Sequence, residues 1–167
     1  MDELNQILAD VRRGDRAAFE ALYESLKTPL YTIILRITHD VALSEDILQD
    51  VFLKLYLSPP EPSVNPRAYI CRIARNLAID CVRKRKPTID LEEAENYLCH
   101  PEADLSLKID IENALQALPD RARQIVTLHI NCDLKFREVA DVLSMPLGTV
   151  LWAYRKAIHQ LRYILEV

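Results

Sequence analysis

Apolar residues recur every three to four positions along most of this 167-residue chain, which is the spacing of an amphipathic α-helix. No stretch alternates between apolar and polar residues in the manner of a strand. The sequence therefore predicts an all-α fold. The predicted helices span residues 2–13, 16–38, 42–57, 67–86, 106–118, 121–131, 135–143 and 147–165.

Prolines interrupt this helical pattern at two places. Pro29 lies inside the second predicted helix, where it is expected to break or kink the helix, because proline lacks the N–H that a helix interior needs. The run from Ser58 to Pro66 contains four prolines and is expected to form a loop, since proline also disfavours helix in the residue before it.

The helical periodicity is poor between residues 87 and 105, where acids are frequent. This change of pattern predicts two small helical domains, at residues 1–86 and 106–167, joined by an acidic linker at 87–105. The formal net charge of the whole chain is −4, but it averages over unlike segments. Residues 67–86 carry seven bases against one acid, residues 87–110 carry seven acids against one base, and residues 147–163 carry three bases and no acid.

The helix predicted at 67–86 separates its bases from its apolar residues. Ile70, Ile73, Ala74, Leu77 and Cys81 fall on one side, and Arg72, Arg75, Asn76, Arg83 and Lys86 fall on the other. This basic stripe is about 20 Å long, so it could follow a line of phosphates. A solvated helix face, with cations placed near the helix C-terminus, is the alternative.

Residues 136–162 show a helix–turn–helix pattern, so the C-terminal domain is predicted to hold this motif. Ser144, Met145 and Pro146 would form the turn. Val150, Tyr154, Ala157, Ile158 and Leu161 would face the domain core, and Thr149, Leu151, Trp152, Arg155, Lys156 and His159 would face outward. Many pairs of packed helices share this pattern and bind no nucleic acid, so the pattern alone leaves the function open.

Other classes of protein are disfavoured. No apolar run reaches the ~18–20 residues of a membrane span, and the first residues have no signal-peptide pattern, so we expect a cytoplasmic protein. The four histidines lie in separate segments and no nucleophile–base motif occurs, so we do not expect an enzyme. The four cysteines form no Cys-x-x-Cys pair, and we expect neither a metal site nor a cofactor.

Several segments, in a fixed order, resemble the bacterial extracytoplasmic-function RNA polymerase sigma factors of the sigma-70 family. These segments are GDRAAFEALYESL, LSEDILQDVFLKLY, NPRAYICRIARNLAIDCVRKRK, ALPDRARQIVTLH and the helix–turn–helix. The resemblance implies an alternative sigma factor that binds core RNA polymerase and directs promoter recognition and melting. It also implies that an anti-sigma factor is a candidate partner.

The resemblance implies roles for three sets of residues. The core-polymerase-binding set is Asp46, Gln49, Asp50, Leu53 and Leu57, although Leu53 and Leu57 could instead pack on the first helix. The set for the minus-ten promoter element is Tyr69, Arg72, Arg75, Asn76, Arg83, Lys84, Arg85 and Lys86. The set for the minus-thirty-five element is Thr149, Leu151, Trp152, Arg155 and Lys156. The loop from Ser58 to Pro66 matches a family loop that helps to enclose a flipped base.

The chain departs from the family pattern in its last helix. Leu151, Trp152 and Ala153 stand where the family usually has a basic residue, serine and arginine, so readout there could depend on apolar contact with thymine methyl groups. Lys135 stands where a capping serine is common. Two alternatives to a sigma factor remain at this point: a stand-alone helix–turn–helix DNA-binding regulator, and a degenerate adaptor that docks on polymerase without recognising a promoter.

Overall fold

The computed structural model describes residues 3–61, 65–85 and 105–165, of which residues 105–109 are described by their backbone only. The described residues form eight α-helices and no strand, which confirms the predicted all-α class. The chain divides into two compact units, Met1–Ala94 and Glu95–Val167. The predicted linker at 87–105 lies outside the described residues except for Leu105, where a helix begins.

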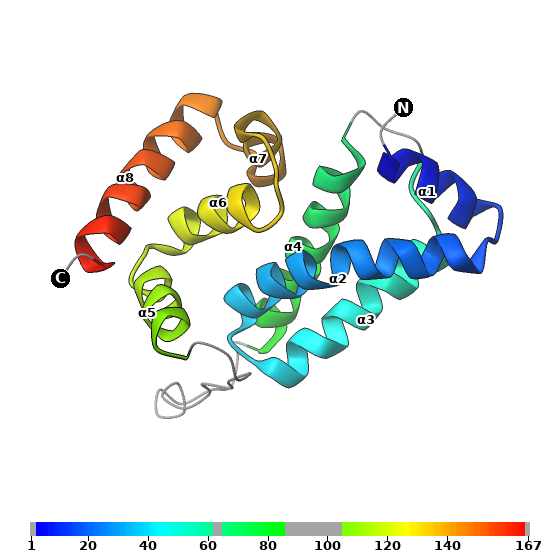
Figure 1. Cartoon of the computed structure of the whole chain (residues 1–167), viewed down its shortest axis with the longest axis horizontal. Helices are drawn as coiled ribbons and strands as arrows, with labels where there is room; N and C mark the ends of the chain where they lie inside the picture. The colour runs from blue at the N-terminus through cyan, green and yellow to red at the C-terminus, as the bar shows by residue number, and fades with distance from the viewer. Residues whose placement is uncertain (1–2, 62–64, 86–104, 166–167) are drawn as a thin grey trace. The chain divides into compact units, whose positions relative to one another are not determined.

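The first unit contains four helices: α1 (Glu3–Arg12), α2 (Arg16–Thr38), α3 (Val41–Leu57) and α4 (Pro66–Arg85). Each bound lies within two residues of its prediction. The long helix α2 is central, because it packs against each of the other three (Figure 1). Apolar side chains repeat along its inner face and are almost completely buried. They are Leu22, Leu26, Leu30, Ile33 and Ile34.

Helix α2 continues from Arg16 to Thr38 through Pro29, so a break at this proline was a wrong prediction. Leu26 and Leu30 are buried in one core on either side of the proline. Their packing holds both halves of the helix in place and offsets the hydrogen bond that proline cannot donate.

Two aspartates start the helices of the first unit. The carboxylate of Asp15 accepts hydrogen bonds from the backbone N–H groups of Ala17 and Ala18, and that of Asp40 accepts one from Leu43 at 2.9 Å. An N-terminal cap of this kind contributes about 1 kcal/mol to helix stability. The caps define where α2 and α3 begin, and they place the start of α3 directly after the αL residue His39 that ends α2.

The second unit contains α5 (Leu105–Gln116), α6 (Asp120–Ile130), α7 (Phe136–Leu143) and α8 (Leu147–Leu165). Helix α8 packs against the other three (Figure 1). Leu115, Leu118, Val126 and Ala157 form a shared core cluster. The buried Arg123 holds the end of α5, because its guanidinium donates to the carbonyls of Leu115, Gln116 and Leu118 at 2.9–3.0 Å.

Helices α7 and α8 form the predicted helix–turn–helix, with a turn that begins at the αL residue Ser144. Lys135 provides no side-chain cap to α7, but its backbone N–H donates to the Glu138 carboxylate at 2.8 Å, so Glu138 caps the helix from within.

His129 connects α6 to this motif. Its ring stacks on Phe136, and its Nδ1 donates to the carbonyl of Leu134 at 2.8 Å.

In the part of the chain that the structure describes, no helix is both long enough and apolar enough to cross a membrane. Within the same residues, no three histidine, cysteine, aspartate or glutamate side chains gather as a metal site would require.

Candidate functional site

The outer face of α3 combines acids with exposed leucines. Asp46, Gln49 and Asp50 are exposed. Leu53 and Leu57 retain 55% and 69% of their accessible surface, so they are not packed on the first helix, and that alternative was wrong. The inner face of the helix is buried through Ile47, Val51, Phe52 and Leu55. The five residues predicted for polymerase binding therefore share one accessible face, which we call the α3 face.

Tyr56 belongs to the same surface and was missed from the sequence. It is 58% exposed, and its ring meets that of Phe19 edge-on at 5.1 Å between centroids. A signal was present, because Tyr56 lies three residues after Leu53 and next to Leu57, within one turn of both. An apolar patch of this kind on a small helical unit is typical of a protein-binding surface.

A groove of about 440 Å³ runs between α2 and α3 beside this face. Lys27 Nζ donates to Glu24 at 2.7 Å, and this hydrogen bond raises the pKa of Lys27 above its ordinary value. Lys27 also lies 5.6 Å from the centre of the Tyr23 ring. The groove is lined by Tyr23, Lys27, Thr28, Tyr31, Glu45, Leu48 and Gln49.

The basic stripe on α4 faces solvent for most of its length. Tyr69 is 46% exposed, Arg75 is half-buried, and the inner residues Ile70 and Ala74 are fully buried. Arg75 Nη1 donates to the Asn76 side-chain oxygen at 3.3 Å. The other described members of the predicted minus-ten set are exposed: Arg72, Asn76, Arg83, Lys84 and Arg85. Lys86 lies outside the described residues.

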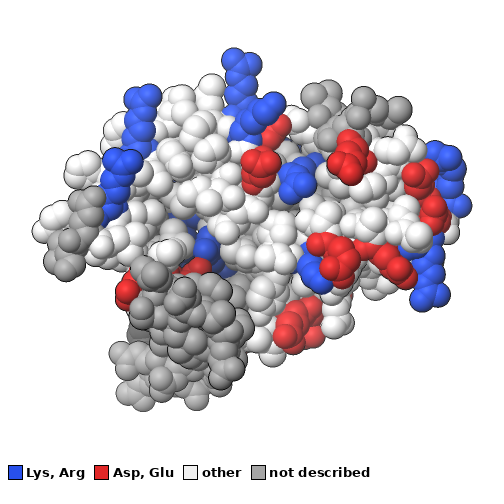
Figure 2. Space-filling model, in the orientation of Figure 1, with Lys and Arg blue, Asp and Glu red and all other residues white. Residues whose placement is uncertain are grey.

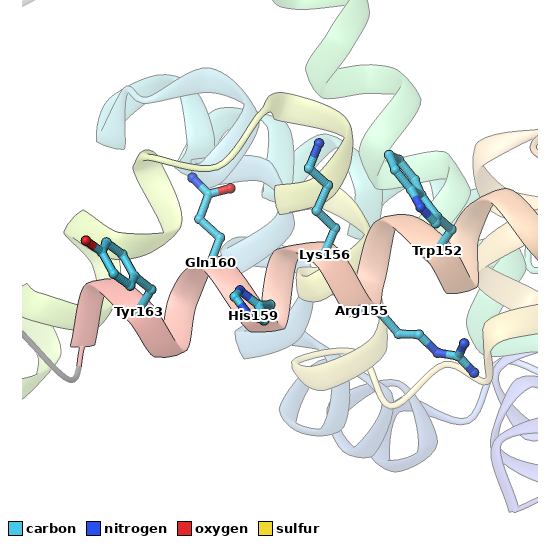
Figure 3. Close-up of a pocket in the computed structure, with 6 residues that line it drawn as sticks. All are labelled: Trp152, Arg155, Lys156, His159, Gln160 and Tyr163. Atoms are coloured by element: carbon cyan, nitrogen blue, oxygen red, sulfur yellow. The ribbon is translucent and has the colours of Figure 1, made fainter.

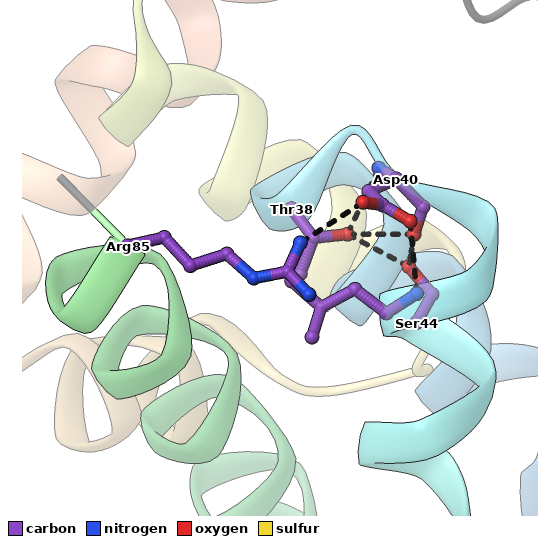
Figure 4. A network of polar contacts seen from close by, with 5 residues as sticks. Thr38, Asp40, Ser44 and Arg85 are labelled. Carbon is purple, nitrogen blue, oxygen red and sulfur yellow. Dashed lines mark hydrogen bonds and ion pairs between the residues drawn. The ribbon is translucent and has the colours of Figure 1, made fainter. Parts of the chain in front are cut away.

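Arg85, a member of the predicted minus-ten set, has an ionic partner within its own unit. Its Nη1 lies 3.1 Å from Asp40 Oδ2, so the last residue of α4 is ion-paired with the cap of α3 (Figure 4). The Thr38 and Ser44 hydroxyls complete this network, with their oxygens 2.7 Å apart. Both charged side chains remain partly exposed, at 56% for Arg85 and 40% for Asp40. Arg85 therefore has a contact within its own unit that the sequence did not predict.

The loop after α3 is held by α1. The Arg12 guanidinium donates to the carbonyl of Pro60 and lies 3.5 Å from the Glu61 carboxylate. Arg12 stands 48 residues before Pro60 in the chain. The described part of the loop is therefore fixed to the first helix, a contact that the sequence did not predict.

The outer face of α8 carries most of the predicted minus-thirty-five set. Thr149, Arg155 and Lys156 are exposed, and Trp152 is 63% exposed. Leu151 is half-buried, so it is the least accessible member of the set. Lys and Arg, with no Asp or Glu, mark the part of the surface that α8 forms in Figure 2, because residues 147–165 contain no acid.

Lys156 Nζ lies 5.1 Å from the centre of the Trp152 ring, within the range of a cation–π interaction. The two side chains project on the same side of α8, whereas Arg155 points away from them (Figure 3). They border a shallow groove of about 530 Å³ along this single helix. The groove is lined by Trp152, Arg155, Lys156, His159, Gln160 and Tyr163.

Two known protein families match the chain, one in each unit. The pattern of sigma-70 region 2 matches residues 22–88, and that of sigma-70 region 4 matches residues 114–163. The first match includes α3 and α4, and the second includes the helix–turn–helix.

Curated proteins with similar sequences are named as RNA polymerase sigma factors. The ECF RNA polymerase sigma factor SigW of Bacillus subtilis is 29% identical over 161 residues, which cover 86% of each chain. The ECF RNA polymerase sigma factor SigK of Mycobacterium ulcerans is 26% identical over 180 residues, which cover 99% of this chain and 95% of that protein.

Solved structures share the fold. CnrH, solved in complex with the cytosolic domain of CnrY, matches with a TM-score of 0.70 at 19% identity and covers 97% of this chain and 96% of its own. The sigma factor RpoE of Bartonella quintana, in complex with the anti-sigma factor NepR, matches with a TM-score of 0.70 at 21% identity and covers 89% of this chain and 98% of its own. The two matched sigma-70 regions, together with the curated relatives, show that the chain belongs to the sigma-70 family, in the group of ECF RNA polymerase sigma factors.

Proposed function

We propose that this chain is an alternative sigma factor that binds core RNA polymerase and directs it to recognise and melt promoters. The observation that carries the proposal is the order of the two matched regions, region 2 and then region 4, each on its own helical unit. We assign residues 1–86 to polymerase and the minus-ten element, and residues 106–167 to the minus-thirty-five element. The site of action would be the cytoplasm, where bacterial polymerase works.

The α3 face is the proposed contact with core polymerase. Its exposed Leu53, Tyr56 and Leu57 would lose water on binding, while Asp46 and Asp50 would supply charge complementarity to a basic partner surface. Burial of the apolar atoms supplies affinity, and the acids select the partner and its orientation.

The α4 stripe is the proposed contact with the minus-ten element. Arg72, Arg83 and Lys84 would hold the phosphates of the non-template strand, and Asn76 would contact a base edge or a phosphate. Extruding a base costs a few kcal/mol, which contacts to the unstacked strand must repay. Tyr69, 46% exposed on the same helix, offers an aromatic surface for stacking.

The outer face of α8 is the proposed contact with the minus-thirty-five element. The second helix of a helix–turn–helix enters the major groove, and its N-terminal residues approach the base edges. Thr149 and Trp152 lie toward that end of α8, and Arg155 and Lys156 follow within the next turn. One structural neighbour was solved with the anti-sigma factor NepR and another with the cytosolic domain of CnrY, which supports an anti-sigma factor as a further partner of this chain.

Reconstitution tests the whole proposal. The purified chain is mixed with core RNA polymerase and a library of promoter fragments, and transcript start sites are mapped by sequencing. We expect transcripts from a shared promoter pattern that core enzyme alone does not produce, and little binding of the free chain to duplex DNA. Tight duplex binding without polymerase, and no new start sites, would instead support a stand-alone DNA-binding regulator.

Substitutions that introduce charge on the α3 face test its proposed contact with core polymerase. Leu53→Asp with Leu57→Asp should weaken core binding at least about 100-fold, because it places two charges where an apolar contact forms. Co-purification with tagged core polymerase measures this. Ile111→Asp with Ile130→Asp, at exposed apolar residues of the second unit, makes the same chemical change and should leave core binding intact. Equal effects of the two pairs would refute the assignment.

A further inference from the structure

Trp152 lies on the outward face of α8, toward the N-terminal end of the helix. On a helix, residues three, four and seven apart share a face, so Trp152 lies in line with Gly148, Arg155, Lys156 and His159. The indole is 63% exposed although the residues that pack α8 into its unit, Val150 and Ala157, are fully buried. Tryptophan is enriched at binding interfaces, so an indole exposed at this position offers a contact surface to a partner.

The surroundings of the indole point to a polyanion. Lys156 holds its ammonium group 5.1 Å from the ring centre, and Arg155 and Arg162 follow along the helix. The described residues of α8 include no acid. An exposed indole with one cation beside it, on a helix that carries further cations and no acid, matches the grooves of DNA, where phosphates flank the base edges, better than it matches a basic or neutral protein groove.

An open notch lies on the N-terminal side of the indole. Gly148, one turn before Trp152, has no side chain, and apart from its two chain neighbours and the adjacent backbone of α8 no atom lies within 4 Å of the position that a Cβ would take. A base edge could therefore approach the helix backbone at Gly148 while the edge of the indole touches the neighbouring base. The apolar group that the major groove offers for such contact is the C5-methyl of thymine.

We propose that Trp152 recognises a thymine of the upstream promoter element by apolar contact with its C5-methyl group, beside phosphates held by Arg155 and Lys156. This inference rests on the proposed function and deepens it, because it assigns a chemistry of readout to one residue. The cation over the ring keeps the indole in one orientation and leaves its far edge available to the base.

The test removes one methyl group at a time. Holoenzyme first selects promoters from DNA with a randomised upstream region, and each thymine of the selected element is then replaced by deoxyuridine, which lacks only the methyl group. We expect one replacement to weaken wild-type holoenzyme binding about fourfold, as the loss of one buried methyl implies. Holoenzyme carrying Trp152→Ala should bind the original promoter more weakly and should not respond to that replacement.

Tyr163→Ala is the matched control. Tyr163 is 71% exposed and lies three turns further along the same face, at the end of α8 where no base edge is expected. This variant should keep the wild-type response to deoxyuridine. Thermal melting of both variants should match wild type, since neither side chain is buried.

The possible outcomes distinguish failure of the thymine contact from failure of the proposed sigma-factor function. Failure of holoenzyme to select any promoter would refute the proposed function. Selection of an element without thymine, a wild-type enzyme that is indifferent to every replacement, or a Trp152→Ala enzyme that still responds would overturn the inference alone. Loss of core binding by Trp152→Ala, with the thymine response retained, would assign Trp152 to a protein contact and also overturn it.

Discussion

The two candidate DNA-binding helices, α4 and α8, are built in opposite ways. Helix α4 packs against α1, α2 and α3 and buries six residues, four of them small: Ala68, Cys71, Ala74 and Ala78. Helix α8 buries only Val150 and Ala157 completely. Helix α4 therefore presents a narrow row of cations from a rigid base, whereas α8 exposes a broad face with an aromatic residue toward its N-terminal end.

This difference in burial implies a difference in recognition. A row of cations binds the phosphates of a DNA strand, and this contact depends little on the base sequence. An aromatic side chain beside open space at Gly148 can distinguish bases by shape, because only thymine carries a C5-methyl group. We infer that α4 contributes mainly affinity for the opened strand and that α8 contributes mainly selectivity, and four predictions follow, from the largest effect to the smallest.

Reversing the charge of the α4 stripe should have the largest effect. Arg83→Glu with Lys84→Glu replaces attraction to phosphates by repulsion, and promoter opening should fall at least about 100-fold while core binding stays unchanged. Permanganate footprinting measures opening, and co-purification measures binding. Arg13→Glu with Arg16→Glu, exposed at the other end of the unit, is the control of equal charge. Opening that survives the first pair would remove α4 from the DNA interface.

The same reversal on α8 should have a smaller effect. Arg155→Glu with Lys156→Glu should weaken holoenzyme binding to duplex promoter DNA about tenfold and leave binding to a single-stranded minus-ten oligonucleotide unchanged. Fluorescence anisotropy with both probes measures this. An equal loss of affinity for both probes would contradict the assignment of separate DNA contacts to α4 and α8.

The salt dependence of DNA affinity distinguishes contacts to phosphates from apolar contacts to bases. Lys84→Gln should reduce the slope of log affinity against log salt by about 0.7–0.9, the value of one phosphate contact. Trp152→Ala should weaken binding without changing the slope. Titrations of holoenzyme with promoter DNA at several salt concentrations give both slopes, and a change of slope for Trp152→Ala would count against its apolar role.

The smallest effect concerns the Arg85–Asp40 pair. Asp40→Ala should lower the free energy of unfolding by about 1 kcal/mol, because it removes the cap of α3. Asp40→Asn retains a capping oxygen and loses only a partly exposed ion pair, so the loss should be a few tenths of a kcal/mol. Urea unfolding measures both variants. Asp15→Asn, at the cap of α2, is the control, and a larger loss for Asp40→Asn than for Asp40→Ala would contradict this account.

Local pattern was enough to predict the helices, because burial of one face of each helix dominates the fold. It failed where contacts join distant parts of the chain. Pro29 was expected to interrupt α2, but the core on both sides of it overrides local propensity. The contact of Arg12 with Pro60, 48 residues further along the chain, was not predicted either.

The candidate surfaces could also be predicted where they depend on one helix, and not where they depend on contacts between distant residues. Exposure of Leu53, Leu57 and Trp152 followed from helical geometry. The ion pair of Arg85 with Asp40 did not, because the two residues are 45 positions apart in the chain. Tyr56 was missed because an aromatic residue between two leucines is more often part of a core.

The carboxylate of Asp40 is shared between two helices, since one oxygen starts α3 and the other holds the end of α4. Anything that draws Arg85 away from it, such as a passing phosphate, changes the electrostatic environment at the beginning of the helix that carries the α3 face. Linkage makes such an influence mutual, so binding of the non-template strand and binding of core polymerase would each affect the other through a single acidic side chain.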